Sequence, residues 1–256
     1  MLTMRQEQVE AFRQHHLQKF EDEMVEHLKK FAPQRCKVAG EEAVRQVIRI
    51  GIENAKKYGF INRGAVRLYI ELMFAFGSYF DTDPQYTWAS AVLDNPEQLE
   101  QMVRADRLWN QARKYLAKVS GPKHEHMHAA LQRLKQSRAE DFIRPGEPLD
   151  ESILLTLPSI FPQRCDYLGG TALRALVRKG LDLAHSYQFE TDTGKVLVVA
   201  LALAVGHRFA DDPLWGWARR RMDTSRFPDP EVREKKLYSA AKVYLEIALA
   251  ADRVSQ

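Results

Sequence analysis

The sequence predicts an all-α fold, and three observations support that prediction. Apolar residues recur at spacings of three and four over long stretches, which is the period of one face of an α-helix. No segment shows the alternation of apolar and polar residues, or the two-residue turns, that are typical of a β-sheet. Capping residues and glycines mark the ends of the helical stretches.

The composition is that of a globular protein that can bury a sizeable core. The chain has 256 residues, of which 45% are hydrophobic and 28% charged, and its formal net charge is +4. That length corresponds to one large domain or two small ones. The hydrophobic fraction excludes a disordered chain, and 13 glycines and 11 prolines exclude collagenous and low-complexity classes. Two cysteines are too few for a disulfide framework and fit a reducing compartment.

The chain repeats itself at a shift of 129 residues. Residues 33–116 align with residues 162–245 without a gap, and 28 of the 84 aligned positions are identical. The run PQRC, for example, occurs at 33–36 and again at 162–165. We therefore predict an internal duplication. Residues kept in both copies are expected to maintain the shared fold, and residues that differ are where a copy-specific function is expected.

The first copy begins with two predicted helices. An apolar stripe from Ala43 to Ala55 predicts the first, which ends near Tyr58 with lysines in its last turn. Asn62 is a candidate N-cap for the second helix, and Gly77 is expected to end it.

Two further helices complete this four-helix unit. Asp83 followed by Pro84 predicts the start of the third, because a carboxylate caps a helix and proline is tolerated at its first position. The fourth is expected from about Asn95 to Leu116. The second copy repeats the plan over 169–187, 190–206, 212–222 and 229–252.

Two segments lie outside the repeat. One is a predicted N-terminal helix over about 4–31, and the other is a bridge that holds a short helix near 123–138 and a loop with the sequence RPGEPLDES. The predicted organisation is an N-terminal helix (1–31), a first repeat unit (32–118), a bridge (119–160) and a second repeat unit (161–256). We expect the two units to pack about a pseudo-two-fold axis or as consecutive layers.

The segment His124-Glu125-His126-Met127-His128 matches the HExxH pattern of zinc proteases. There, two histidines four residues apart bind the metal and the glutamate is the general base. Here the segment follows Ser-Gly-Pro-Lys at the first turn of a short helix, with no apolar lead-in and no evident third ligand. A solvated linker is therefore the preferred interpretation, and a metal-dependent hydrolase using His124, Glu125 and His128 is the alternative.

A basic segment distinguishes the second copy from the first. Arg219, Arg220 and Arg221 stand where the first copy has Ser-Ala-Val, and His207 and Arg208 replace a serine and a tyrosine. These five residues are candidates for binding an acidic protein partner or, as a second alternative, nucleic acid. A solvated helix face is the plain explanation.

Several paired residues have structural explanations. Asp83 and Asp212 each precede a proline, which predicts helix capping rather than a cation site, because the oxygen ligands of a calcium loop are missing. Cys36 and Cys165 have no histidine at a matching position, so burial as small hydrophobic residues is expected instead of catalysis.

The segments RQVIRIGIENAKKYGF and LMFAFGSYFDTDPQYTWA, at 45–60 and 72–89, resemble an uncharacterised bacterial family. Its members carry YGI followed by LMFxLGxxFDxDPxxPWA, often after an N-terminal helix similar to residues 3–30 here. The resemblance covers mainly 3–95, and Thr87 departs from the usual proline. Members are often encoded beside type VI secretion spike and effector genes. The resemblance thus implies an accessory, chaperone or immunity role and identifies no catalytic residue.

The sequence therefore predicts a non-catalytic protein-binding module, with a type VI secretion accessory role as its specific version. We expect a protein partner, no cofactor and no resident metal. The first thirty residues are charged throughout, without the apolar core of a signal peptide. The most apolar run, Val196 to Gly206, is about half as long as a membrane span and predicts a buried helix. A cytoplasmic location is expected.

Overall fold

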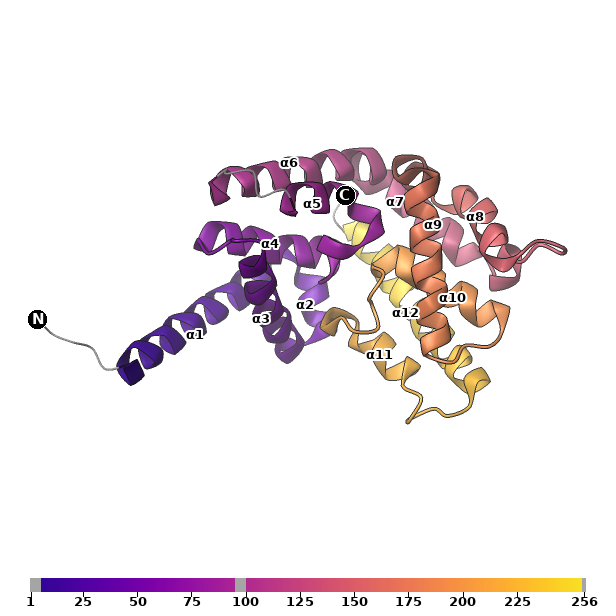
Figure 1. Cartoon of the computed structure of the whole chain (residues 1–256). Coiled ribbons are helices and arrows are strands. Elements are labelled where there is room, and N and C mark those ends of the chain that lie inside the picture. Colours follow the sequence, from indigo (N-terminus) through magenta and orange to yellow (C-terminus); the bar gives the residue numbers. More distant parts are fainter. Residues whose placement is uncertain (1–5, 95–99, 255–256) are drawn as a thin grey trace, which may run out of the picture.

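The computed structural model describes residues 6–94 and 100–254, and every regular element within these ranges is helical (Figure 1). The α-helices are α1 (Gln6–Phe31), α2 (Pro33–Ala39), α3 (Glu41–Lys57), α4 (Arg63–Phe76), α5 (Thr87–Leu93), α6 (Gln101–Val119), α7 (Glu125–Gln136), α8 (Leu149–Ile160), α9 (Pro162–Ser186), α10 (Asp192–Val205), α11 (Gly216–Met222) and α12 (Pro230–Val254). Short 3₁₀ turns are η1 (Phe80–Thr82), η2 (Pro84–Tyr86), η3 (Pro122–His124), η4 (Ala139–Phe142) and η5 (Pro213–Trp215). The predicted all-α class is confirmed.

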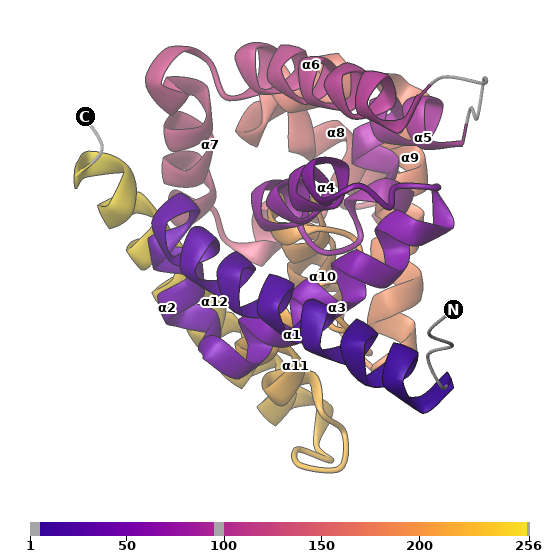
Figure 2. The ribbon, with the colours of Figure 1, turned by 90° about the vertical axis from the view of Figure 1, so that its left-hand side faces the viewer.

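The helices surround one continuous core. Helices α2 to α6 form one half of the molecule and α9 to α12 the other, while α7 and α8 connect them (Figures 1 and 2). The second part of α1 packs on α3, and its first part projects from the body. Buried apolar side chains form a single cluster that extends from Met24 in α1 to Leu237 in α12. Both halves therefore share one hydrophobic core.

The predicted helices of the first copy are present with small changes at their ends. Helix α3 buries the predicted stripe, and Gly77 ends α4 with its N–H bonded to the carbonyl of Met73. Asn62 does stand at the N-cap of α4, but its side chain makes no capping hydrogen bond. The Asp83 carboxylate caps η2, one short turn before α5 begins. Asn95, the predicted start of the fourth helix, lies outside the described residues, and α6 begins at Gln101.

The bridge contains a helix, α8, whose first turn overlaps the predicted loop. The segment RPGEPLDES includes the first turn of α8, which extends to Ile160. Pro148 stands at its N-cap. The carboxylates of Asp150 and Glu151 in the first turn stabilise the helix, because they lie at the positive end of its dipole. Ser152 stabilises the turn further, since its hydroxyl donates to the carbonyl of Phe142 at 2.8 Å. The loop prediction was wrong for residues 149–152.

The two halves meet through matching contacts. The Asp83 carboxylate accepts from the backbone N–H of His207 at 2.9 Å, and the Asp212 carboxylate accepts from the backbone N–H of Ser78 at 2.8 Å. Each acceptor and each donor has its counterpart 129 residues away. A β-carbon on Gly77 would lie 3.1 Å from the carbonyl oxygen of Val205, so glycine permits this close approach.

Arg104 and Arg233 are another pair at equivalent positions. Each is buried and donates hydrogen bonds to backbone carbonyls within its own half. Arg104 donates to the carbonyls of Tyr58 and Leu93, at 2.8 and 3.1 Å. Arg233, which is fully buried, donates to four carbonyls between 2.6 and 3.1 Å away. Their acceptors are the carbonyls of helix ends and loops, which would otherwise lack hydrogen bonds.

The most apolar run of the sequence lies in α10. Most of its side chains are buried in the core, as predicted. Among the described residues no helix combines the length and the hydrophobicity needed to cross a bilayer.

Candidate functional site

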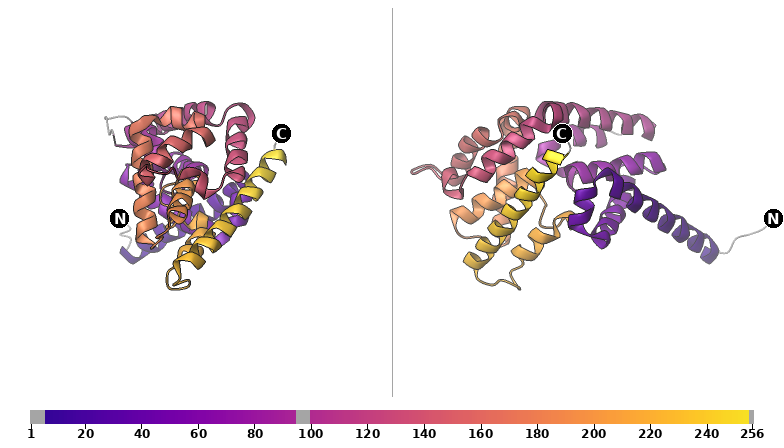
Figure 3. Two further views of the ribbon diagram at one scale, coloured as in Figure 1. Left: turned by 90° about the vertical axis from the view of Figure 1, so that its right-hand side faces the viewer. Right: turned by 180° about the vertical axis from the view of Figure 1, so that it is seen from behind.

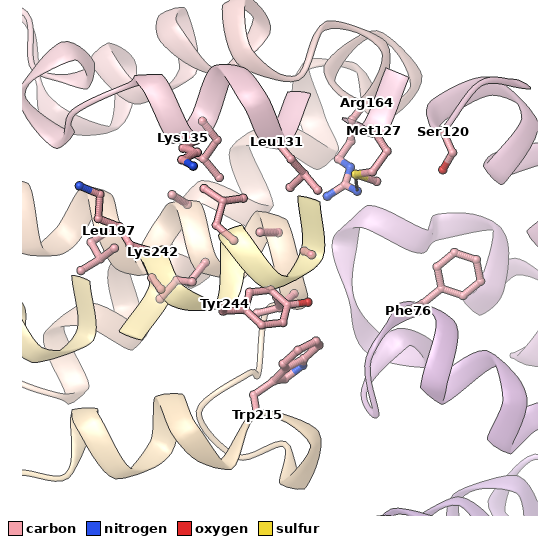
Figure 4. Close-up of a pocket in the computed structure, with 18 of the residues that line it drawn as sticks. Phe76, Ser120, Met127, Leu131, Lys135, Arg164, Leu197, Trp215, Lys242 and Tyr244 are labelled. Atoms are coloured by element: carbon pink, nitrogen blue, oxygen red, sulfur yellow. Dashed lines mark hydrogen bonds between the residues drawn. The ribbon is translucent and has the colours of Figure 1, made fainter. Parts of the chain in front are cut away.

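A cavity of about 260 Å³ lies between the two halves. Its walls come from α2, α4, α6, α7, α9, α10 and α12 together with η2 and η5 (Figure 4). Small-molecule sites in proteins range from about 300 to about 1,000 Å³, so this cavity lies just below that range and suits a small ligand.

Residues that align at the shift of 129 positions line the cavity from both halves. Six pairs of lining residues stand 129 positions apart in the sequence: Arg35 and Arg164, Ala75 and Ala204, Phe76 and Val205, Tyr86 and Trp215, Tyr115 and Tyr244, and Leu116 and Leu245. Helix α7 of the bridge adds Met127, Leu131, Leu134 and Lys135. Both halves therefore contribute walls to the cavity, and α7 of the bridge closes part of it.

The charged side chains that line the cavity are all positive. Its lining includes Arg35, Lys135, Arg164 and Lys242, and it includes no aspartate or glutamate. Lys135 has an ion-pair partner, Glu246, at 3.5 Å. The remaining walls are mostly leucine, alanine and aromatic side chains.

Arg164 is held at the cavity by neutral groups. Its side chain is 6% exposed, and its guanidinium donates to the carbonyl of Leu203. The other contacts are weak. The Gln85 amide oxygen is 3.4 Å from Nη1. The Met127 sulfur, which lies beside Arg164 in Figure 4, is 3.7 Å from Nη2. Nε has no hydrogen-bond partner in the described structure. A buried cation is ordinarily paired with a carboxylate, and Arg164 has none within ion-pair distance among the described residues.

Arg35, the counterpart of Arg164, has still fewer contacts. Its guanidinium lies 5.4 Å from the centre of the Trp215 ring, which is cation–π distance. Its Nη1 is buried and lacks a hydrogen-bond partner among the described residues. The position equivalent to Gln85 is Leu214, which offers no amide oxygen. The second copy therefore leaves Arg35 without the neutral acceptor that Arg164 has.

Aromatic polar groups add hydrogen-bonding capacity to the wall. The Tyr115 hydroxyl and the Trp215 indole N–H are buried without hydrogen-bond partners in the described structure. Burial raises the pKa of Tyr86, Tyr115 and Tyr244 above the usual 10, so these hydroxyls stay protonated at neutral pH. The rings of Tyr86 and Tyr115 meet edge to face at 5.3 Å. Neutral tyrosines offer O–H donors to an acceptor in the cavity.

The HEHMH segment lies on the surface beside this cavity. His124 is exposed with a left-handed backbone (φ 60°), and Glu125 is exposed at the first turn of α7. His128 is half-buried, and its Nε2 lacks a hydrogen-bond partner in the described structure. Among the described residues, no group of three or more His, Cys, Asp or Glu side chains is arranged to hold a metal ion.

The five basic residues of the second copy divide into two groups. His207 is buried, with its ring Nδ1 3.2 Å from the Asp83 carboxylate, and Arg208 stacks over Tyr79 and pairs with Asp211 at 3.0 Å. In α11, Arg219 and Arg220 are exposed and Arg221 is half-buried. None of these three arginines has an ion-pair partner within the described ranges. His207 thus belongs to the contact between the halves and does not lie on the surface with Arg219 and Arg220.

The two cysteines are unpaired and buried. Burial raises the pKa of the Cys36 thiol and raises that of Cys165 to about 11. Both thiols are therefore protonated at neutral pH and are poor nucleophiles. This agrees with the expectation that they are buried as small hydrophobic residues.

The cavity was not among the sites predicted from the sequence. The sequence feature that corresponds to it is the repeated PQRC run, which places Arg35 and Arg164 at equivalent positions but does not distinguish them from structural arginines such as Arg104 and Arg233. Comparison with protein-family models, with curated proteins and with solved structures gave no match.

Proposed function

We propose that this chain is a non-catalytic protein-binding module that recognises an acidic partner through α11. The observation that supports it is the run Arg219 to Arg221, which has no carboxylate partner within the described residues and differs from the Ser-Ala-Val of the first copy. Unpaired surface arginines are favourable interface residues, because their planar guanidinium groups bind carboxylates with two hydrogen bonds.

The specific version of this proposal is an accessory, immunity or chaperone role in type VI secretion. It is supported by the resemblance of residues 3–95 to the bacterial family described above. In that role the acidic partner would be an effector toxin or a component of the secretion apparatus.

A charge-neutralised variant tests the proposal. Arg219→Ser, Arg220→Ala and Arg221→Val together give α11 the residues of the first copy. A matched control removes three exposed cations elsewhere, by Lys56→Ser, Lys57→Ala and Lys114→Ser. Affinity capture from the source cells, followed by mass spectrometry, should recover a protein with the native chain and the control and lose it with the α11 variant.

Two outcomes would contradict the proposal. One is the capture of no protein specific to the native chain, and the other is equal capture by the α11 variant. If the native chain instead binds DNA or RNA with steep salt dependence, and the α11 variant does not, the nucleic-acid alternative replaces the protein-binding one.

We also propose that the two halves arose by duplication of one four-helix unit. The in-register identities support it, as do the equivalent contacts of Asp83 and Asp212 and of Arg104 and Arg233. The proposal is tested by an experimental structure, in which residues 33–116 should superpose on residues 162–245 in the same order. Failure to superpose would contradict it.

A further inference from the structure

We propose that the cavity between the halves is a binding site for an amphipathic anion, a molecule with one carboxylate or phosphate head and a short apolar tail. This site is separate from α11, so the proposal does not depend on a protein partner. Its basis is a pair of arginines that line the cavity and have no carboxylate within ion-pair distance among the described residues, although Asp83 and Asp212 act on them from farther away.

Comparison with Arg104 and Arg233 shows that the cavity arginines are unusual. Arg233 donates to four carbonyls, so its two terminal nitrogens are fully used within the protein. Arg164 is almost as buried, but it has one close carbonyl and otherwise only distant contacts to an amide and a sulfur. Arg35 has a buried terminal nitrogen with no partner in the described structure. The cavity arginines thus retain donors that an anion can accept.

The arrangement of the donors indicates where the head would bind. Arg35, Tyr86 and Arg164 line the same cavity, and the Tyr86 hydroxyl experiences the positive charge of both arginines together with the opposing charge of Asp83. Tyr115 contacts Tyr86 through its ring and has an unpartnered hydroxyl. A carboxylate or phosphate between these groups would receive charge-assisted hydrogen bonds from guanidinium and further ones from tyrosine.

The rest of the cavity suits an apolar tail. Leucines and alanines of α7, α10 and α12 form its walls, among them Leu131, Leu197 and Leu245. The exposed lining residues are Lys135, Tyr238 and Lys242, all on α7 and α12, which run side by side along one face of the molecule (Figure 3). The cavity therefore reaches solvent between these two helices, where Lys242 favours the approach of an anion and Lys135 is paired with Glu246.

Calorimetric titration of the full chain tests this site. The probes are hexanoate, octanoate, decanoate and dodecanoate, together with decyl phosphate and the uncharged analogue decanol. We expect one site per chain, and an affinity that rises with tail length until the cavity of about 260 Å³ is full and then falls. Comparison of decanoate with decyl phosphate identifies the preferred head. Decanol should bind at least about tenfold more weakly than the better of these two, because it lacks the charge.

Two variants assign the binding to the cavity. Arg35→Met removes a half-buried guanidinium while keeping a side chain of similar length, and it should weaken binding by about tenfold or more. Ala241→Phe places a ring in the wall and should abolish binding of the longer probes. Arg113→Met, an exposed substitution in α6, is the matched control and should leave binding unchanged. Circular dichroism establishes that each variant is folded.

Three results would overturn the proposal. The first is that none of the probes binds to the native chain. The second is that Arg35→Met and Ala241→Phe, both folded, bind decanoate as tightly as the native chain does. The third is that decanol binds as tightly as the charged probes, which would show an apolar cavity without selection for an anion.

Discussion

The carboxylate of Asp83 lies 2.9 Å from the backbone nitrogen of His207, although the two residues are 124 positions apart in the chain. The same carboxylate caps η2 by accepting from the N–H of Gln85 at 2.9 Å. Asp212 performs the same two tasks in the other half, for Leu214 and Ser78. Each aspartate therefore links a local turn to the contact between the halves.

This double role predicts a large loss of stability for Asp83→Ala. The change removes a cap and leaves the buried N–H of His207 without an acceptor, so we expect unfolding to become easier by about 2 to 4 kcal/mol. Urea denaturation followed by circular dichroism measures it. The control is Asp229→Ala, because Asp229 is exposed and caps only its own helix. There the loss should be about 1 kcal/mol. Equal losses for the two variants would show that the contact between the halves contributes nothing.

Glu21 predicts a pH-dependent contribution to stability. It is buried between α1 and α3, where Arg49 donates to it at 2.8 and 2.9 Å and Arg45 donates at 3.1 Å. Burial raises the pKa of Glu21, but the hydrogen bonds from Arg49 and Arg45 outweigh that effect and hold the pKa below its usual 4.5. The stabilisation is therefore complete above pH 4.5 and is lost as the pH falls through the lowered pKa of the folded state.

Glu21→Gln should accordingly cost about 2 kcal/mol at neutral pH and progressively less at acid pH. Urea denaturation at a series of pH values gives the difference from the native chain. Glu42→Gln is the control, since Glu42 is exposed and lies 3.8 Å from Arg49, and it should have little effect at any pH. A deficit in Glu21→Gln that stays constant down to the lowest pH at which both proteins fold would contradict the prediction.

Close packing of α9 on α10 predicts that Gly180→Ala is destabilising. A β-carbon at this position would lie 2.9 Å from Cγ2 and 3.0 Å from Cα of Val199, so the backbone of α10 has to move. We expect a loss of about 1 to 3 kcal/mol from this overpacking. Gly170→Ala meets open space directly after the non-helical Gly169, where α9 is kinked, and should have little effect. Thermal unfolding of both variants measures the contrast, and similar melting temperatures would refute the packing argument.

The buried cysteines predict slow thiol chemistry in the folded protein. Since the pKa of Cys165 is raised to about 11 and Cys36 is also buried, few thiolates form at about pH 8. A thiol reagent such as Ellman's should react slowly with the native chain and rapidly with both thiols after unfolding in urea. Fast reaction of the folded protein, or fewer than two thiols after unfolding without a reductant, would contradict this expectation.

Local patterns predicted most of the helices because the causes of those helices are local. The stripe of α3, the end of α4 at Gly77 and the cap by Asp83 depend on residues within a few positions of one another. The start of α8 was missed because Pro, Gly and Asp in RPGEPLDES are typical of loops. Its hydrogen bond between Ser152 and Phe142 depends on how η4 folds back beside it, which composition does not reveal.

The site was harder to predict, because it is formed by contacts between distant segments. PQRC identified Arg35 and Arg164 as equivalent, but not as two walls of one cavity. His207 was grouped with Arg219 to Arg221 because all differ between the copies, yet the contact with Asp83 buries it. Similarity along the sequence shows which residues correspond, and only the folded chain shows which of them meet.

Gln85 and Leu214 stand at equivalent positions of the two halves, and this difference makes the surroundings of the two cavity arginines unlike. Reciprocal contacts such as those of Asp83 and Asp212 are the kind that a symmetric dimer of identical subunits makes. In a dimer of that kind each residue occurs on both sides of the axis, whereas within one chain the two sides can differ. Here Arg164 has an amide oxygen beside it, whereas the equivalent position near Arg35 is a hydrocarbon side chain. The two arginines that line the cavity therefore differ in the donors they leave free, and an anionic occupant has one preferred orientation.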